Sequence, residues 1–221
     1  MRCSRADAKA SAALLARVDH LVYATPDLDL AIDKLEKLLG VRATPGGPHP
    51  GRGTRNALIA LGPATYLEIF GPDPEQPKPE KPRGFGVDDL QAPRIAAWLA
   101  HEDHLDQLVS KAALQGVKLG KIIPGSRKRP DGVVLSWHFT DPATILADGI
   151  VPIFIDWGQS PHPAGGAAKG ATLVDFRAEH PDPQPVKKML SQLGLVLPVQ
   201  TGLKPALIVT IACPRGRVDL S

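Results

Sequence analysis

Residues 18–40 read VDHLVYATPDLDLAIDKLEKLLG, and this stretch decides the fold because its pattern returns later in the chain. A short apolar segment leads through a turn into an amphipathic helix that stops at Gly40. Residues 171–194 read ATLVDFRAEHPDPQPVKKMLSQLG and repeat that succession at nearly the same length. A weaker copy starts with RIAAW at residues 94–98, and its helix ends at Gly116. One supersecondary unit is therefore expected three times.

The residues after each helix predict three further strands per unit. The triplet ALI at residues 57–59 recurs at 206–208, and YLEI at 66–69 is matched by RVDL at 217–220. Each unit is thus expected to be βαβββ, which gives an α+β fold. We divide the chain into a leader at 1–17 and units at 18–72, 83–158 and 170–221. Polar, proline-rich stretches lie between the units.

Composition excludes several function classes. The chain has 221 residues, 43% of them hydrophobic and 22% charged, as in an ordinary globular protein. A net charge of +3 and an aromatic fraction of 5% argue against nucleic-acid binding. No apolar run approaches the roughly 20 residues of a membrane helix. With two widely spaced cysteines and no signal-peptide pattern, we expect a cytoplasmic protein that associates with no membrane.

Familiar nucleotide and redox motifs are also missing from the sequence. It contains no glycine-rich phosphate loop between strand and helix, no nucleophile elbow and no CxxC pair. Function must therefore be sought where the repeats differ. Only the first repeat has a histidine, His20, in its opening strand and a glutamate, Glu68, in its closing strand.

Several segments resemble the vicinal oxygen chelate superfamily, and more closely its glyoxalase-like group. They are VDHLVYATPDLDLAI, HPGRGTRNALI, ATYLEIFGPD, SRKRPDG, and IVPIFIDWG followed by His162-Pro163. The resemblance implies cupped mixed sheets with helices outside. The fold hosts isomerases, lyases, dioxygenases and non-catalytic binding proteins, so it does not name the reaction.

His20 and Glu68 match the positions that hold a divalent metal in the superfamily. Strand alternation places His20 on one face with Val22 and Ala24, and Glu68 on one face with Tyr66 and Phe70. We expect the imidazole and the carboxylate within about 5 Å of each other, the reach of a shared metal. A core histidine hydrogen-bonded to a glutamate would give the same proximity.

Typical members take further ligands from a paired repeat, and this chain departs from that pattern. The position matching His20 is Ala96 in the second repeat and Thr172 in the third. Asp156 or Asp219 could complete a site with His20 and Glu68. We name Glu68 and Asp156 as candidate catalytic residues, with strand-end capping as the other interpretation of Asp156.

The loop from His49 to Asn56 is a candidate substrate-binding segment. Gly51 and Gly53 allow close backbone approach, and Arg52 and Arg55 offer fork-shaped donors to an anion. Only one of the two arginines is expected to enter the cleft, and we favour Arg52. The other interpretation is a solvated turn whose arginines aid solubility.

Aromatic residues of the second repeat complete the candidate site. We expect Trp137, Trp157 and His162 to contact the substrate, together with His49 and Asn56. Of Trp137 and His138, only one can face inward. The run Arg127-Lys128-Arg129 is expected to be solvated.

The leading functional prediction is a divalent-metal-dependent lyase, isomerase or dioxygenase that acts on a small oxygenated organic substrate. The alternative is a non-catalytic protein that sequesters a small molecule in the same cup. The expected partner is a small molecule, and a homodimer is the assembly that we allow for.

Overall fold

A computed structural model describes residues 11–129 and 131–221. The first ten residues of the expected leader, including Cys3, lie outside the described part, and residues 11–15 are helical. The elements that follow are β1 (Val18–Ala24), α2 (Leu28–Leu39), β2 (Thr44–His49), β3 (Thr54–Gly62), β4 (Thr65–Pro72), η1 (Gly84–Asp89), β5 (Arg94–His101), α3 (Leu105–Leu114), β6 (Ile122–Lys128), β7 (Val134–Thr140), η2 (Ala147–Gly149), β8 (Ile153–Asp156), η3 (Pro163–Gly165), β9 (Thr172–His180), α4 (Pro183–Gln192), β10 (Val199–Thr201), β11 (Ala206–Cys213) and β12 (Gly216–Leu220).

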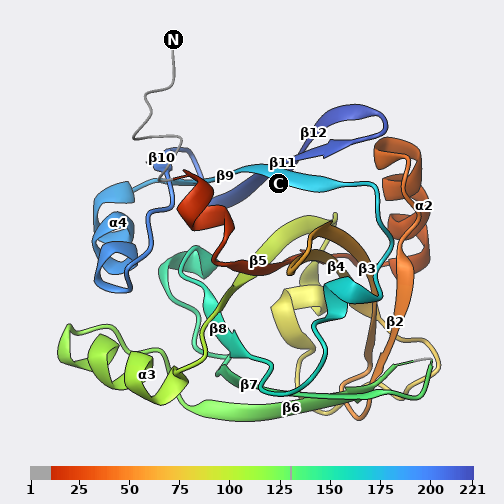
Figure 1. Ribbon diagram of the computed structural model, residues 1–221, viewed down its shortest axis with the longest axis horizontal. Coiled ribbons are helices and arrows are strands. Elements are labelled where there is room, and N and C mark those ends of the chain that lie inside the picture. Colours follow the sequence, from red (N-terminus) through yellow and green to blue (C-terminus); the bar gives the residue numbers. More distant parts are fainter. Residues whose placement is uncertain (1–10, 130) are drawn as a thin grey trace.

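The first two repeats form one eight-stranded sheet. Its strand order is β2-β3-β4-β1-β5-β8-β7-β6, so each repeat contributes four neighbouring strands. The repeats join where β1 runs antiparallel to β5, and within each repeat the first and last strands are parallel. The two edge strands, β2 and β6, come into contact because the sheet curls (Figure 1). The expected cupped, mixed sheet is confirmed.

The third repeat keeps the expected element order but not the strand order. It forms a separate four-stranded sheet in the order β10-β9-β11-β12. In the first two repeats the opening strand pairs with the closing strand, whereas β9 pairs with β10 and β11 on its two sides. Both edges of β9 are therefore occupied, and β12 can pair only with β11. The third unit is not a further cup of the same kind.

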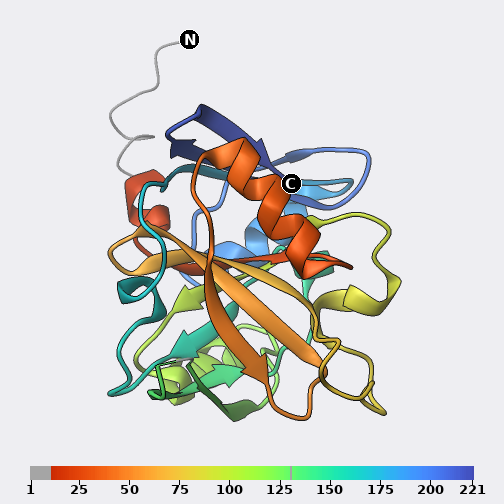
Figure 2. The same ribbon diagram turned by 90° about the vertical axis from the view of Figure 1, so that its right-hand side faces the viewer.

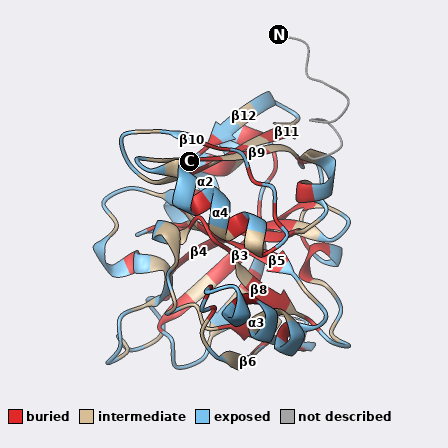
Figure 3. Cartoon of the chain, turned by 90° about the vertical axis from the view of Figure 1, so that its left-hand side faces the viewer, coloured by how far each residue is buried: buried red, intermediate tan, exposed pale blue. Residues whose placement is uncertain are grey.

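Helices lie on the outside, as expected. Asp27 caps α2 by accepting a hydrogen bond from the Leu30 N–H at 3.0 Å, and Gly40 ends the helix with φ of 75°. Figure 2 shows α2 crossing the outer side of the first-repeat strands. Exposed residues dominate the outward surfaces of α3 and α4 (Figure 3). No helix in the described ranges is long and apolar enough to cross a membrane.

Each face of the eight-stranded sheet is covered by its own apolar cluster. On the convex side, Trp98 of β5 packs against Phe176 of β9 with ring centroids 5.1 Å apart, and its indole N–H donates to the Ile150 carbonyl at 2.8 Å. The four-stranded sheet of the third repeat therefore covers the convex face. On the concave side a smaller cluster includes Val22 and Leu99, and this face holds the cavity.

Candidate functional site

A cavity of about 150 Å³ opens on the concave face, with a polar wall and an apolar wall. The polar wall comes mainly from the first repeat and consists of His20, His49, Arg52, Thr54, Asn56, Tyr66 and Glu68. The apolar wall comes mainly from the second repeat and includes Leu99, Trp137, Phe139, Ile153, Ile155 and Trp157. The cavity thus suits a molecule with oxygen atoms at one end and a carbon skeleton at the other.

His20 and Glu68 face each other on adjacent parallel strands. The His20 Nε2 atom lies 3.7 Å from Glu68 Oε2, and both side chains are nearly buried. Val22 and Ala24 share the face of His20, and Tyr66 and Phe70 share that of Glu68, as the alternation predicted. The expected proximity is confirmed, although the distance is longer than a hydrogen bond.

Asp19 contacts His20 on the side away from Glu68, and no motif in the sequence predicted this role. The carboxylate is 1% exposed and lies 2.6 Å from His20 Nδ1. It also accepts a hydrogen bond from Trp157 Nε1 at 3.0 Å and lies 3.2 Å from His162 Nε2. Burial alone would raise the pKa of Asp19, but hydrogen bonds and electrostatic interactions with His162 and His20 lower it to about 2.

This carboxylate fixes the tautomer of His20. An ionised Asp19 only accepts, so His20 donates from Nδ1 and presents Nε2 to the cavity. His162 behaves in the opposite way: its Nδ1 accepts from the Ala164 N–H at 3.2 Å, so its Nε2 carries the proton toward Asp19. Tyr66 stacks on the His20 ring with centroids 4.5 Å apart, which further limits ring rotation.

Asn56 orients the other partner of the pair. Its Nδ2 donates to Glu68 Oε1 at 2.5 Å, which leaves Oε2 directed toward His20. Asn56 Oδ1 is buried and has no hydrogen-bond partner among the described residues. A Cβ added to Gly46 of β2 would lie 2.1 Å from this oxygen, so the oxygen is packed against β2 and is not open to the cavity.

His49 is a neutral imidazole on the same wall. Burial is the main cause that lowers its pKa, to about 4, and the positive charges of Arg127 and Arg52 lower it further against the opposing effect of Glu68. Its Nδ1 lies 3.0 Å from Thr54 Oγ1, and its Nε2 lies 3.9 Å from Glu68 Oε1. A neutral imidazole of this kind can donate a hydrogen bond without carrying charge.

The two loop arginines separate as the sequence predicted. Arg52 lines the cavity at its mouth and is exposed, whereas Arg55 pairs with Asp29 of α2 at 2.8 Å. Gly51 and Gly53 take φ angles of 71° and 61°, which favour glycine. The turn that carries Arg52 therefore depends on both glycines.

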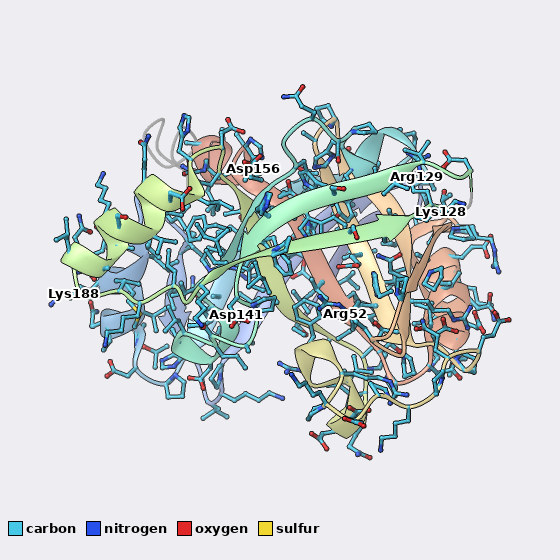
Figure 4. All side chains as sticks on the ribbon, turned by 90° about the horizontal axis from the view of Figure 1, so that it is seen from below. Arg52, Lys128, Arg129, Asp141, Asp156 and Lys188 are labelled. Carbon is cyan, nitrogen blue, oxygen red and sulfur yellow. The ribbon has the colours of Figure 1, made fainter. Side chains whose placement is uncertain are left out.

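The second repeat contributes aromatic residues but not its carboxylate. Trp137 lines the cavity 5.2 Å from Trp157, and His138 is exposed. Ile155 and Trp157 line the cavity on either side of Asp156, which is not among the lining residues; it accepts from the Gly158 N–H at 2.7 Å. In the view of Figure 4 the labels of Asp156 and Arg52 fall on opposite sides of β6 and β7. Strand alternation thus directs Asp156 away from the cavity, which corrects the expectation that it faces inward.

Three further expectations need correction. His162 does not line the cavity but contacts it indirectly, through Asp19 and through an edge-on contact with Tyr66 at 5.6 Å. Asp219 lies on β12 of the four-stranded sheet, where it pairs with Arg177 at 2.9 Å. The run at residues 127–129 is not uniformly solvated, since Lys128 is exposed whereas Arg127 is 5% exposed and lines the cavity.

Comparison with known proteins decides the family. The family model described as a glyoxalase-like domain matches residues 18–194. The chain belongs to the glyoxalase-like domain family. This confirms the resemblance to the vicinal oxygen chelate superfamily. No curated protein sequence matches the chain.

Solved structures are similar to this glyoxalase-like protein at low sequence identity. A hypothetical protein from Staphylococcus aureus superposes with a TM-score of 0.62 and 14% identity, over 91% of this chain and 83% of that one. Methylmalonyl-CoA epimerase from Mycobacterium tuberculosis has a TM-score of 0.43 and 21% sequence identity, over 69% of this chain and 93% of that one. The Streptomyces coelicolor methylmalonyl-CoA epimerase in complex with 2-nitronate-propionyl-CoA has a TM-score of 0.45 and 17% sequence identity, over 67% of this chain and 99% of that one.

The glyoxalase-like fold implies a divalent metal, and the donor atoms of the cavity test that implication. His20 and Glu68 supply one imidazole and one carboxylate, while β5 and β8 present Leu99, Ile153 and Ile155, which carry no donor. His49 approaches the other oxygen of Glu68. Within residues 11–129 and 131–221, no three His, Cys, Asp or Glu side chains are grouped so that they could hold a metal. Catalytic zinc sites use three protein ligands, so this donor set does not fit one.

Proposed function

We propose that this glyoxalase-like protein is an enzyme of the isomerase or lyase type that moves a proton on a small oxygenated organic substrate. The observation that carries the proposal is the 3.7 Å separation of His20 Nε2 and Glu68 Oε2 within the cavity. Both groups can hold a proton, and each is oriented by a neighbour, Asp19 for His20 and Asn56 for Glu68. The proposal needs no metal, because the donor set does not supply a metal site.

Glu68 acts as the base in this scheme. Its Oε2 takes a proton from the carbon next to a substrate carbonyl, and the electron pair of that C–H bond forms the double bond of an enolate. The carbonyl oxygen then carries the negative charge. Glu68, now protonated, returns the proton to a carbon of the enolate, or passes it to Nε2 of His20, which delivers it to that carbon. In a lyase a β-substituent leaves instead with its bonding electrons.

Neutral donors stabilise the enolate oxygen. We assign His49 the tautomer in which its Nδ1 accepts from the Thr54 hydroxyl, so that its Nε2–H is directed toward the polar region near Glu68. Because its pKa is lowered to about 4 by burial, this imidazole remains neutral at pH 7 and donates a hydrogen bond.

Solvent deuterium exchange tests this function. Phenylpyruvate is a suitable probe, since it combines a carbonyl, an acidic C–H and an apolar ring. We expect the wild-type protein to accelerate exchange at that carbon, measured by NMR, and Glu68→Gln and His20→Asn each to lower the rate by about 100-fold or more. Asp156→Asn is the matched carboxylate control and should exchange like wild type. Exchange that survives Glu68→Gln would refute the proposal.

The apolar wall favours a second candidate, a protein that sequesters a small molecule. Trp137 and Trp157 offer a large surface to a carbon skeleton without any chemistry. In that case phenylpyruvate would bind, no exchange would occur, and Glu68→Gln would change affinity rather than a rate.

A further inference from the structure

Arg127 is a buried cation that faces the cavity. It lies on the edge strand β6, its side chain lines the cavity, and the residue is 5% exposed. One of its N–H groups donates to the Gly46 carbonyl on β2. None of the ion pairs within residues 11–129 and 131–221 involves Arg127. A buried charge without a counter-charge is costly, which points to an anionic ligand.

The surroundings of Arg127 place its charge beside the polar wall. After burial, its positive charge is among the causes that lower the pKa of His49, and it also acts on the Tyr66 hydroxyl. The only hydrogen bond that its guanidinium makes within the described residues is the one to Gly46, so donors of the planar fork remain for a ligand.

Arg127 is a stronger anchor than Arg52 on physical grounds. Arg52 is exposed at the mouth of the cavity, where water and salt screen its charge. Arg127 is held in a low-dielectric wall by the bond to Gly46, so an anion gains more from pairing with it and loses less entropy in fixing it. This reverses the sequence-based preference for Arg52.

We infer that Arg127 is the anion anchor of the cavity and that the substrate is a small carboxylic acid whose carboxylate pairs with its guanidinium. The carbon skeleton would then lie along Trp137 and Trp157, with its carbonyl near Glu68. The inference deepens the proposed function and rests on it for the reaction, whereas the binding step can be measured by itself.

Calorimetry with phenylpyruvate and its methyl ester tests the anchor. We expect the acid to bind wild type about 10- to 100-fold more tightly than the ester, the range for a charge-assisted hydrogen-bonded pair. Arg127→Met should remove that preference by weakening the acid alone, and Arg127→Lys should restore part of it. Arg129→Met is the matched control, because Arg129 pairs with Asp131 and does not line this cavity.

Arg127 also joins the two edge strands, so Arg127→Met could fail to fold. In that case the ratio of the wild-type affinities for the acid and the ester is the deciding measurement. No binding of the acid, equal binding of acid and ester, or an unchanged acid affinity in a folded Arg127→Met variant would overturn the inference. Arg127-dependent binding without deuterium exchange would refute the proposed reaction and keep the anchor. Deuterium exchange that depends on Glu68 but is unchanged by Arg127→Met and by esterification of the probe would refute the anchor alone.

Discussion

The Nδ1 atom of His20 lies 2.6 Å from Oδ1 of Asp19, the residue that immediately precedes it in the chain. Consecutive residues of a regular strand point to opposite faces, but the β1–β5 register shifts between Val18 and His20. That irregularity lets Asp19 reach back to its neighbour. Since Asp19 also contacts Trp157 and His162, one buried carboxylate links the first-repeat histidine to the end of the second repeat and the segment that follows it.

Asp19→Asn tests this link. The amide cannot accept from three donors as the carboxylate does, so we expect the free energy of unfolding to fall by about 3 kcal/mol in urea titrations. The deuterium exchange rate should fall by about 100-fold or more, because His20 loses its tautomer and orientation.

The ring nitrogen NMR shifts of His20 separate positioning from general damage. We expect them to show a changed tautomer in Asp19→Asn and no change in Asp103→Asn, which removes an exposed carboxylate beside His101. Unchanged His20 shifts in Asp19→Asn would contradict the role given to Asp19.

Burial of His49 makes the fold sensitive to moderate acid. Its pKa is about 4 in the folded protein, below the ordinary value of 6.5, because burial disfavours the charged form. Between these values the unfolded chain binds more protons, so stability is complete above about pH 6.5 and is lost as pH falls toward 4. Urea titrations should show a loss on the order of 3 kcal/mol across this window.

His49→Gln is the control for that pH dependence, since glutamine does not titrate. We expect it to flatten the stability profile between pH 6.5 and 4 and to leave the loss at lower pH. That lower loss belongs to groups such as Asp19, whose pKa of about 2 lies below its ordinary 3.8. Equal profiles for the two proteins would show that His49 is not buried in a neutral form.

Gly125 makes room for the Trp137 indole. A Cβ at this position of β6 would overlap the ring, so Gly125→Ala should displace Trp137 from the apolar wall. We expect the affinity for phenylpyruvate, measured by calorimetry, to fall by about 10-fold, with little change in stability because Trp137 is only partly buried. Gly165→Ala is the matched control, since a Cβ there meets no atom within 4 Å. Equal losses in both variants would contradict this account.

Local patterns in the sequence predicted the elements and much of the polar wall. Strand alternation placed His20 and Glu68 on one face, and the flanking glycines of Arg52 indicated that it, not Arg55, reaches the cavity. The same parity rule excludes Asp156 once Trp157 is placed inward, and this signal was available before the structure.

Other features depend on contacts that no local pattern reports. Asp19 turns toward His20 through an irregularity in the β1–β5 pairing. Arg127 is buried because the curl of the sheet brings its two edges together, although 81 residues separate it from Gly46. The third repeat has the pattern of the others, yet the pairing of β9 with β10 rather than with the closing strand arises only in three dimensions.

In the proposed reaction, His20 and Glu68 move a proton without a resident metal. The most direct measurement is the rate of deuterium exchange into phenylpyruvate, before and after exhaustive chelation, together with elemental analysis of untagged protein purified without chelator. We expect far less than one divalent ion per chain and the same Glu68-dependent rate in both samples. A near-stoichiometric metal that is lost together with exchange on chelation or on His20→Ala, and that restores exchange when added back to the chelated wild-type protein, would contradict this expectation.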